Sequence, residues 1–397
     1  MLERRPLFGA LIGLTLVFTI WHMSFQEAVS NGANGVNGGG SGPYPPEPPV
    51  AVVTWSELAG NQTGWYSAAP PMGFMLVNPA DSLPKDDYTS LIDLKDFKFT
   101  INFSNCSGSS RSSRSGSRSR SRRRKREDDA DAPSDSLKSD DRRSPLVLVL
   151  VHSAPTNWYK RNTIRDTWGR YDPRAKLVFL LGAVNSSVLQ RRIEQENRMY
   201  DDIVQGSFLD AYRNMTYKHV MALKWFTYHC PEAKYVLKAD DDVFVNTPAL
   251  YDVLAGLQTQ RRRLLFCQEI RNAPVKRTHR SKWFVSIPEY RDKYYPDHCP
   301  GYSILYTPDV AYQLYREAMR QPYFWIDDVH ITGTIARRIN VTITPTDAML
   351  LNRTAKDAIV AGRANATDQL FFFTTPDLRE GEIRKLWKAV TAGGGGR

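Results

Sequence analysis

The feature that most restricts the fold is an uninterrupted apolar run, PLVLVLVHS, at residues 145–153. Every residue from Leu146 to Val151 is aliphatic and branched. A half-buried strand alternates polar and apolar side chains, whereas a short continuous apolar run suits a central parallel strand that is covered on both faces. The run therefore predicts the core strand of a sheet that is buried on both sides.

Strand and helix patterns alternate after this run. Expected strands lie at 176–182, 202–208 and 235–242, with an earlier half-buried strand at 97–104, and expected helices lie at 187–200, 216–230 and 247–257. Thr247 is the expected N-cap of the last helix, with Pro248 at its first position. The alternation predicts an α/β fold, whose ligands lie at the carboxyl ends of the strands. The sequence has neither a GxGxxG nor a GxxxxGK[ST] motif, so it supports neither a dinucleotide site nor a P-loop.

The excess of positive charge lies in one segment. The formal net charge is +11, and the run SGSSRSSRSGSRSRSRRRKR at 107–126 holds eight Arg and one Lys without any acid. Because the rest of the chain is close to neutral, the charge argument concerns this segment alone. An Arg/Ser-rich RNA-associated protein is the alternative that it raises, but the chain has no RNP-type aromatic motif, and the amino terminus and sequons described next argue against it, so we expect no nucleic-acid partner. We expect residues 107–143 to form an insertion without a core. The end of the run, RRRKR, fits the pattern cut by lumenal proprotein convertases, and an uncut loop is the alternative.

The amino terminus indicates the compartment. An apolar stretch at 7–23 follows Arg4 and Arg5, which predicts an uncleaved signal anchor, with a cleaved signal peptide as the alternative. The basic flank places residues 1–6 in the cytosol. A lumenal stem at 24–87, a globular domain at 88–390 and a flexible tail at 391–397 would follow. Eight N-glycosylation sequons agree with a lumenal location: Asn61, Asn102, Asn105, Asn185, Asn214, Asn340, Asn352 and Asn365.

Four cysteines, Cys106, Cys230, Cys267 and Cys299, lie on the expected lumenal side. An oxidising compartment allows two disulfides, with three connectivities that the sequence spacing does not separate. The absence of a CxxC pair argues against a zinc site.

Three adjacent carboxylates occur in KADDDVFVN at 238–246. Asp240 and Asp242 are two residues apart at the end of an expected strand. One carboxylate can bind a divalent ion there, and the other can bind ion-bound water or a ribose hydroxyl. Oxygen ligands suit Mg²⁺ or Mn²⁺, which then bridge a diphosphate. The alternative is an acidic turn on the surface.

Two further patterns carry possible chemistry. Asp327 and Asp328 follow aromatic residues in FWIDDVHITG, and a partly desolvated carboxylate has a raised pKa and can remove a proton from a hydroxyl. A helix N-cap is the alternative for this pair. Arg161 and Arg165 are four residues apart on one expected helical face, and their guanidinium groups suit a phosphate. A solvated helix face is the alternative there.

Taken together, the segments RNTIRDTWG, FLLG, KADDDVFVN, SKWFVS, YYPDHCPGYSILYT and DDVHITG resemble, in this order, the β-1,3-galactosyltransferase family. The resemblance covers residue 88 to the 380s. It implies a GT-A fold, UDP-galactose or a related UDP-sugar as donor, Mn²⁺, and inverting transfer that forms a β1→3 bond. It also implies a glycan acceptor on a glycoprotein or glycolipid, and a type II protein of the Golgi membrane.

The resemblance also implies roles for individual residues. Asp328 would be the catalytic base, and Asp240 and Asp242 would bind the metal. The donor would be contacted by Ser153, Arg161, Arg165, Lys238, Asp240 and Asp241. Cys230 would pair with Cys299, which leaves Cys106 to pair with Cys267.

Three departures from the family pattern leave alternatives open. Asp327 stands where the family usually has Glu, the segment CPGYSILY replaces a more common acceptor-side pattern, and no His follows His330 to serve as a third metal ligand. A GlcNAc or GalNAc donor and an inactive, lectin-like relative are the alternatives.

Overall fold

The computed structural model describes residues 79–103, 106, 144–257 and 262–392. The expected anchor at 7–23, nearly all of the expected stem and the expected insertion at 107–143 lie outside these residues. Within the described part, no helix combines the length and apolar character needed to span a bilayer.

The strands of the main sheet are β1 (Phe99–Ile101), β2 (Val147–His152), β3 (Ala175–Ala183), β4 (Ile203–Leu209), β5 (Tyr235–Asp240), β6 (Leu265–Cys267), β7 (Ser303–Tyr306) and β8 (Ile343–Pro345). A second pair consists of β9 (Leu350–Leu351) and β10 (Phe373–Thr374). The α-helices are α3 (Trp158–Asp166), α4 (Ser187–Tyr200), α5 (Met215–His229), α6 (Thr247–Gly256), α7 (Pro308–Ala318), α8 (Ala336–Arg338), α9 (Arg353–Val360) and α10 (Glu380–Ala392). Four short 3₁₀ turns, η2 (Pro79–Ser82), η3 (Asp87–Thr89), η4 (Tyr212–Asn214) and η6 (Asp347–Met349), and one π-helix, η5 (Val329–Ile335), complete the elements described.

The main sheet has the strand order β1-β4-β3-β2-β5-β7-β6-β8. Strands β4, β3, β2 and β5 run parallel, and β8 runs parallel to β6. Strand β7 is antiparallel to both β5 and β6, and β1 is antiparallel to β4. The prediction of an α/β fold with a mostly parallel central sheet flanked by helices is confirmed.

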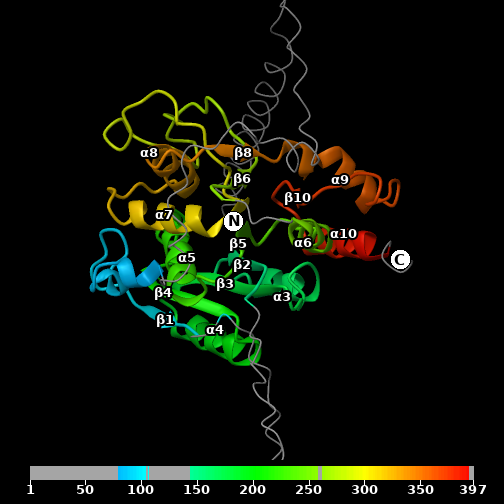
Figure 1. Ribbon diagram of the computed structural model, residues 1–397, viewed down its shortest axis with the longest axis horizontal. Coiled ribbons are helices and arrows are strands. Elements are labelled where there is room, and N and C mark those ends of the chain that lie inside the picture. The colour runs from blue at the N-terminus through cyan, green and yellow to red at the C-terminus, as the bar shows by residue number, and fades with distance from the viewer. Residues whose placement is uncertain (1–78, 104–105, 107–143, 258–261, 393–397) are drawn as a thin grey trace, which may run out of the picture. The chain divides into compact units, whose positions relative to one another are not determined.

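Helices cover both faces of the central strand β2, all six residues of which are buried. Leu148 and Leu150 pack in one cluster with α5 and α7. Val147, Val149 and Val151 pack in a second cluster with α3, α6 and α10. Figure 1 shows the same division, with α5 and α7 on one side of the strands and α3, α6 and α10 on the other. Burial on both faces explains why this strand has no polar alternation.

The start of α6 differs from the sequence-based expectation. Its N-cap is Asn246, and Thr247 is already the first helical residue. The Thr247 hydroxyl does not cap the helix because it donates to the carbonyl oxygen of Trp168 at 2.8 Å. The side chain therefore ties α6 to the end of α3.

The segment before the expected insertion is docked on the sheet and on two helices. β1 pairs with β4 at the edge of the sheet. Lys224 of α5 is fully buried, and its Nζ donates to the carbonyl oxygen of Ser90 at 2.9 Å and contacts Tyr315 Oη of α7 at 3.0 Å. Tyr228 Oη donates to Asp87 Oδ2 at 2.7 Å. These buried polar contacts make residues 87–101 part of the domain.

The disulfides are Cys106–Cys230 and Cys267–Cys299, with Cα–Cα distances of 5.0 and 5.7 Å. The pairing implied by the resemblance, Cys230 with Cys299 and Cys106 with Cys267, is wrong. Cys267 ends β6, whose neighbour β7 begins shortly after Cys299. Cys230 follows α5, against which the segment that leads to Cys106 is docked. Proximity in the fold therefore decides the pairing.

Candidate active site

The carboxyl ends of β2 and β5 form the floor of the candidate site. The two strands are parallel neighbours, and His152 lies in register with Asp240. Ser153 and Asp241 directly follow these two residues, so the polar residues after each strand meet at one edge of the sheet. In parallel sheets this edge is where ligands bind.

The middle carboxylate of the three, Asp241, is buried and has three side-chain donors. It accepts from Ser153 Oγ at 2.7 Å, Asn157 Nδ2 at 2.9 Å and Lys160 Nζ at 3.1 Å. These bonds hold the loop before α3 against the end of β5. Ser153 and Asp241 therefore hold each other in place. The carboxylates of Asp240 and Asp242, on either side of Asp241, stay available to a ligand.

Asp240 and Asp242 keep 33% and 27% of their side chains exposed. The carboxylate of Asp240 nevertheless lies among buried groups, and burial raises its pKa to about 6 against the opposing charge of Lys238. Burial also raises the pKa of Asp242, against the opposing charge of Lys160. At both carboxylates the effect of burial on the pKa therefore exceeds the opposing effect of the neighbouring lysine.

A divalent cation fits this donor set. Two carboxylates with accessible oxygens suit Mn²⁺ or Mg²⁺, and a cation would relieve the repulsion that contributes to their raised pKa values. In the described part of the chain, three potential ligand atoms lie within 4.8 Å of one another only at Cys106, Cys230 and Glu232, where the two cysteines form a disulfide. Asp240 and Asp242 are thus two candidate ligands, and the described residues do not identify a third.

Two lysines accompany the carboxylates. Lys160 Nζ lies 3.1 Å from Asp241 Oδ1 and 3.6 Å from Asp242 Oδ2. Lys238 on β5 is 2% exposed, and its Nζ donates to Asp240 Oδ1 at 2.9 Å and to the carbonyl oxygen of Gly301. Two N–H groups of the Lys238 ammonium are thus bonded within the protein. Its expected contact with the donor stays a prediction.

The guanidinium groups expected to bind phosphate are engaged with carboxylates. Arg161 is completely buried and pairs with Glu196 through Nε at 2.8 Å and Nη2 at 2.7 Å. Arg165 pairs with Asp202 through two bonds of 2.8 Å and stacks on Tyr200, with 4.0 Å between Cζ and the ring centroid. In this structure both arginines join α3 to α4 and to the residue before β4. Their expected contact with a phosphate stays a prediction.

We therefore expect Arg161→Ala to lower the free energy of unfolding by about 3–5 kcal/mol, the usual cost of leaving one member of a buried ion pair without its partner. Burial opposes ionisation of Glu196, but Arg161 and Arg165 outweigh it and lower the pKa of this carboxylate. Loss of Arg161 leaves Glu196 with only part of that compensation. Urea denaturation followed by circular dichroism measures the change.

The matched control is Arg192→Ala on α4, where the arginine is exposed. We expect this variant to stay within about 0.5 kcal/mol of the wild type. An Arg161→Ala protein of unchanged stability that binds UDP more weakly would instead support the phosphate-binding role.

The second acidic pair lies at the amino end of η5. Asp328 Oδ1 accepts from the backbone N–H of Val329 at 2.8 Å, so this residue caps the helix. Burial raises the pKa of Asp328 to about 7, and the adjacent charge of Asp327 adds to the effect. Burial works against ionisation of Asp327 as well, but a hydrogen bond from His219 and the charge of Lys238 lower its pKa. Asp327 is thus ionised at neutral pH, whereas Asp328 gains or loses its proton near pH 7.

The two acidic clusters belong to one site. Lys238 contacts Asp240, and its pKa, which burial alone would lower, is raised by the charges of Asp240, Asp327 and Asp328. A Cβ atom at Gly301 would lie 3.2 Å from Lys238 Nζ and 3.7 Å from Asp328 Cβ. The chain approaches both clusters closely at this glycine.

Two functional candidates escape sequence-based analysis, His219 and Tyr306. His219 lies on α5 and Tyr306 on β7, and their side chains hydrogen bond to each other at 2.9 Å. A histidine within a mostly buried helix has no pattern that distinguishes it from core residues. Only the packing of α5 against β7 and η5 shows what it contacts.

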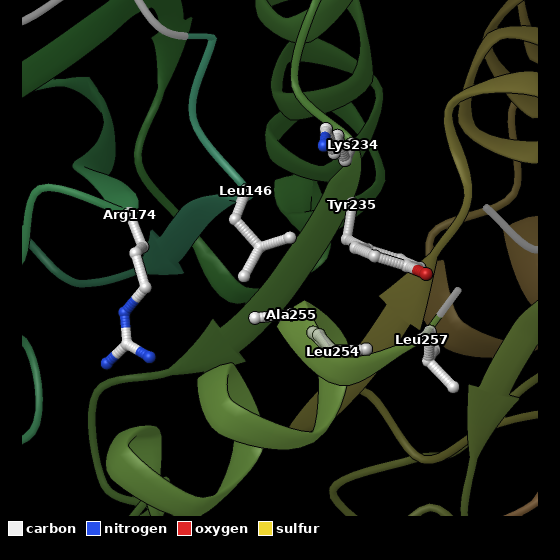
Figure 2. Close-up of a pocket in the computed structure, with 7 residues that line it drawn as sticks. All are labelled: Leu146, Arg174, Lys234, Tyr235, Leu254, Ala255 and Leu257. Atoms are coloured by element: carbon white, nitrogen blue, oxygen red, sulfur yellow. The ribbon is translucent and has the colours of Figure 1, made fainter. Parts of the chain in front are cut away.

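A cavity of about 300 Å³ lies at the opposite end of the sheet. Figure 2 shows it between Leu146, Tyr235 and Leu254, at the amino ends of β2 and β5. Arg174 also lines this cavity, and its guanidinium group already pairs with Asp172 and Asp252. The cavity contains none of the carboxylates described above, so we place the candidate site at the carboxyl edge.

Comparison with known proteins identifies relatives of this chain. A family model described as "Galactosyltransferase" matches residues 159–347, which include both acidic clusters. The chain is 34% identical over 210 residues to "Beta-1,3-galactosyltransferase 5" of Gorilla gorilla gorilla, covering 52% of this chain and 70% of that protein. It is 31% identical over 205 residues to "Beta-1,3-galactosyltransferase 1" of Mus musculus, covering 51% and 63%. A solved galactosyltransferase LgtC, in complex with donor and acceptor sugar analogues, aligns over 58% of this chain and 87% of its own, with a TM-score of 0.31 and 10% identity.

Proposed function

Since the chain belongs to the β-1,3-galactosyltransferase family, we propose that it transfers galactose from UDP-galactose to a 3-hydroxyl group of a glycan, with inversion at the anomeric carbon. The single observation that carries the mechanism is the environment of Asp328. A general base is most effective when its pKa lies near the working pH. Burial, together with the charge of Asp327, raises the pKa of Asp328 to about 7.

In the proposed step, ionised Asp328 accepts the proton of the acceptor 3-hydroxyl group. The hydroxyl oxygen forms a bond to the anomeric carbon while the bond from that carbon to the diphosphate oxygen breaks, and UDP leaves with the bonding electrons. Attack from the face opposite UDP inverts the anomeric carbon. One base suffices, so no covalent intermediate between sugar and protein is needed.

Asp240 and Asp242 would hold Mn²⁺, which when bound supplies positive charge for the departing diphosphate. Asp241, which lies between them, holds the loop before α3 against the end of β5 through its bonds to Ser153, Asn157 and Lys160. Lys238 contacts Asp240, and its charge also acts on Asp328. This division of tasks is our proposal for how the two acidic clusters cooperate.

A donor screen tests the proposal. The purified lumenal part would be incubated with Mn²⁺, a panel of β-linked glycan acceptors, and UDP-galactose, UDP-GlcNAc or UDP-GalNAc. We expect product only with UDP-galactose, a β1→3 linkage by NMR, and loss of product on chelation of the metal. Turnover with another donor would reassign the sugar, and acceptor binding without any turnover would support the inactive, lectin-like alternative.

We also propose a type II arrangement in the Golgi membrane, anchored through residues 7–23. This part of the proposal derives from the sequence alone. A fluorescent fusion of the full chain is expected to colocalise with Golgi markers and to carry endoglycosidase-sensitive glycans. A nuclear signal would favour the Arg/Ser-rich RNA-associated alternative.

A further inference from the structure

His219 is a completely buried side chain that contacts one member of the second acidic pair. Its Nδ1 lies 3.0 Å from Asp327 Oδ2, and its Nε2 lies 2.9 Å from Tyr306 Oη. In the described part of the chain, His219 is the only side chain that hydrogen bonds to Asp327. A row of three polar groups therefore runs from β7 through α5 to the start of η5.

The chemistry of the partners determines where the protons lie. An ionised carboxylate only accepts hydrogen bonds, so Nδ1 of His219 carries the proton and donates to Asp327. Burial lowers the pKa of His219, which keeps the ring neutral, so Nε2 accepts from Tyr306. Burial raises the pKa of Tyr306, and its hydroxyl stays protonated as the donor. Tyr306 thus donates to His219, and His219 donates to Asp327. Both hydrogen bonds favour the ionised form of Asp327.

We propose that His219 is a positioning residue for the transfer reaction: it keeps Asp327 ionised beside Asp328, and so makes Asp328 the stronger base of the two. The inference rests on the proposed role of Asp328. It adds the reason why, of two adjacent carboxylates, only one takes the proton of the acceptor.

Other charged and titratable groups surround the pair. Lys238 and Asp240 act on it from β5, Tyr212 from η4 and His330 from η5, and Tyr295 and Tyr323 lie on the neighbouring loops. Lys238 lowers the pKa of both carboxylates, whereas His219 hydrogen bonds to Asp327 and not to Asp328. Among the described side chains, His219 is therefore the one whose hydrogen bond lowers the pKa of Asp327 without acting on Asp328 in the same way.

Two substitutions separate the two ring nitrogens. Asn at position 219 places an amide near the position of Nδ1 and can keep the bond to Asp327. Gln places its amide near the position of Nε2, so it can keep the hydrogen bond to Tyr306 but loses the one to Asp327. The pH dependence of kcat at saturating donor and acceptor would be measured for wild type, His219→Asn and His219→Gln, with exposed His279→Gln as the matched control.

In the wild type, kcat should rise with pH through a midpoint of about 7, because Asp328 must be ionised to act. His219→Asn and His279→Gln should keep this midpoint. In His219→Gln, Asp327 retains its proton and no longer opposes ionisation of Asp328, so the midpoint should fall by about one pH unit. The plateau should fall on the order of tenfold, because Asp328 becomes a weaker base.

A plateau that falls in His219→Gln without any movement of the midpoint would overturn the inference, since a purely structural role lowers kcat equally at every pH. If the Gln variant does not fold, Asp327→Asn gives the second measurement, because it removes the charge directly and should lower the midpoint in the same way. An unchanged midpoint there also overturns the inference. Failure of the proposed function is distinguishable, because Asp328→Asn would then retain turnover.

Discussion

Asp328→Asn is expected to lower kcat for galactosyl transfer by about 10²- to 10⁴-fold, the range that a positioned general base contributes. The amide has nearly the same shape as the carboxylate and can still accept the bond that caps η5 from Val329. It cannot accept a proton from the acceptor hydroxyl group. The fold should therefore survive, and only the proton transfer should be lost.

The measurement compares kcat with the affinity for UDP in the same preparation. UDP binding, measured by calorimetry in the presence of Mn²⁺, should stay at the wild-type value, because Asp328 is not among the proposed metal ligands. Asp347→Asn serves as the control, since Asp347 is exposed at the first turn of η6. Near wild-type turnover in Asp328→Asn would show that another group is the base.

Asp242→Asn should fail for a different reason. Loss of one of two carboxylate ligands is expected to weaken Mn²⁺ binding by at least about 10- to 100-fold, which is the loss seen even for groups that only support a metal ligand. UDP affinity should then lose its dependence on Mn²⁺, and turnover should fall with it. The neighbouring Lys160 would remain bonded to Asp241, so the loop before α3 should keep its position.

Mn²⁺ binding can be followed without activity, by the loss of the free-ion signal in electron paramagnetic resonance. Asp347→Asn should bind Mn²⁺ as the wild type does. Unchanged Mn²⁺ affinity in Asp242→Asn would remove this residue from the metal site, while leaving the assignment of Asp328 intact.

Much of the fold is predictable because burial leaves a periodic trace in the sequence. The run at 145–153 identifies β2 since both faces of that strand are covered, and α4 appears at 187–200 as expected because one face stays polar. The position of Asp240 and Asp242 at the end of a strand follows from the same alternation. These predictions depend only on neighbours along the chain.

The parts that escape prediction depend on what packs against a residue. Helical spacing places Arg161 and Arg165 on one face of α3, but it does not reveal that Glu196 and Asp202 cover that face. The disulfide pairing likewise depends on β6 lying beside β7, which the order of the chain does not show. The role of His219 requires β7 and η5 to meet at one helix. Such facts belong to the tertiary structure alone.

The docking of β1 on β4 has a practical consequence for any shortened form of this protein. The match to the family model begins at residue 159, which by itself would favour a shortened protein that starts just before β2. A protein that began there would expose the hydrogen-bonding edge of β4 and leave Cys230 with an unpaired thiol. Open strand edges recruit other chains. A shortened protein should therefore begin before Pro79 if it is to stay soluble. Forms that begin just before β2 should aggregate and cross-link between molecules.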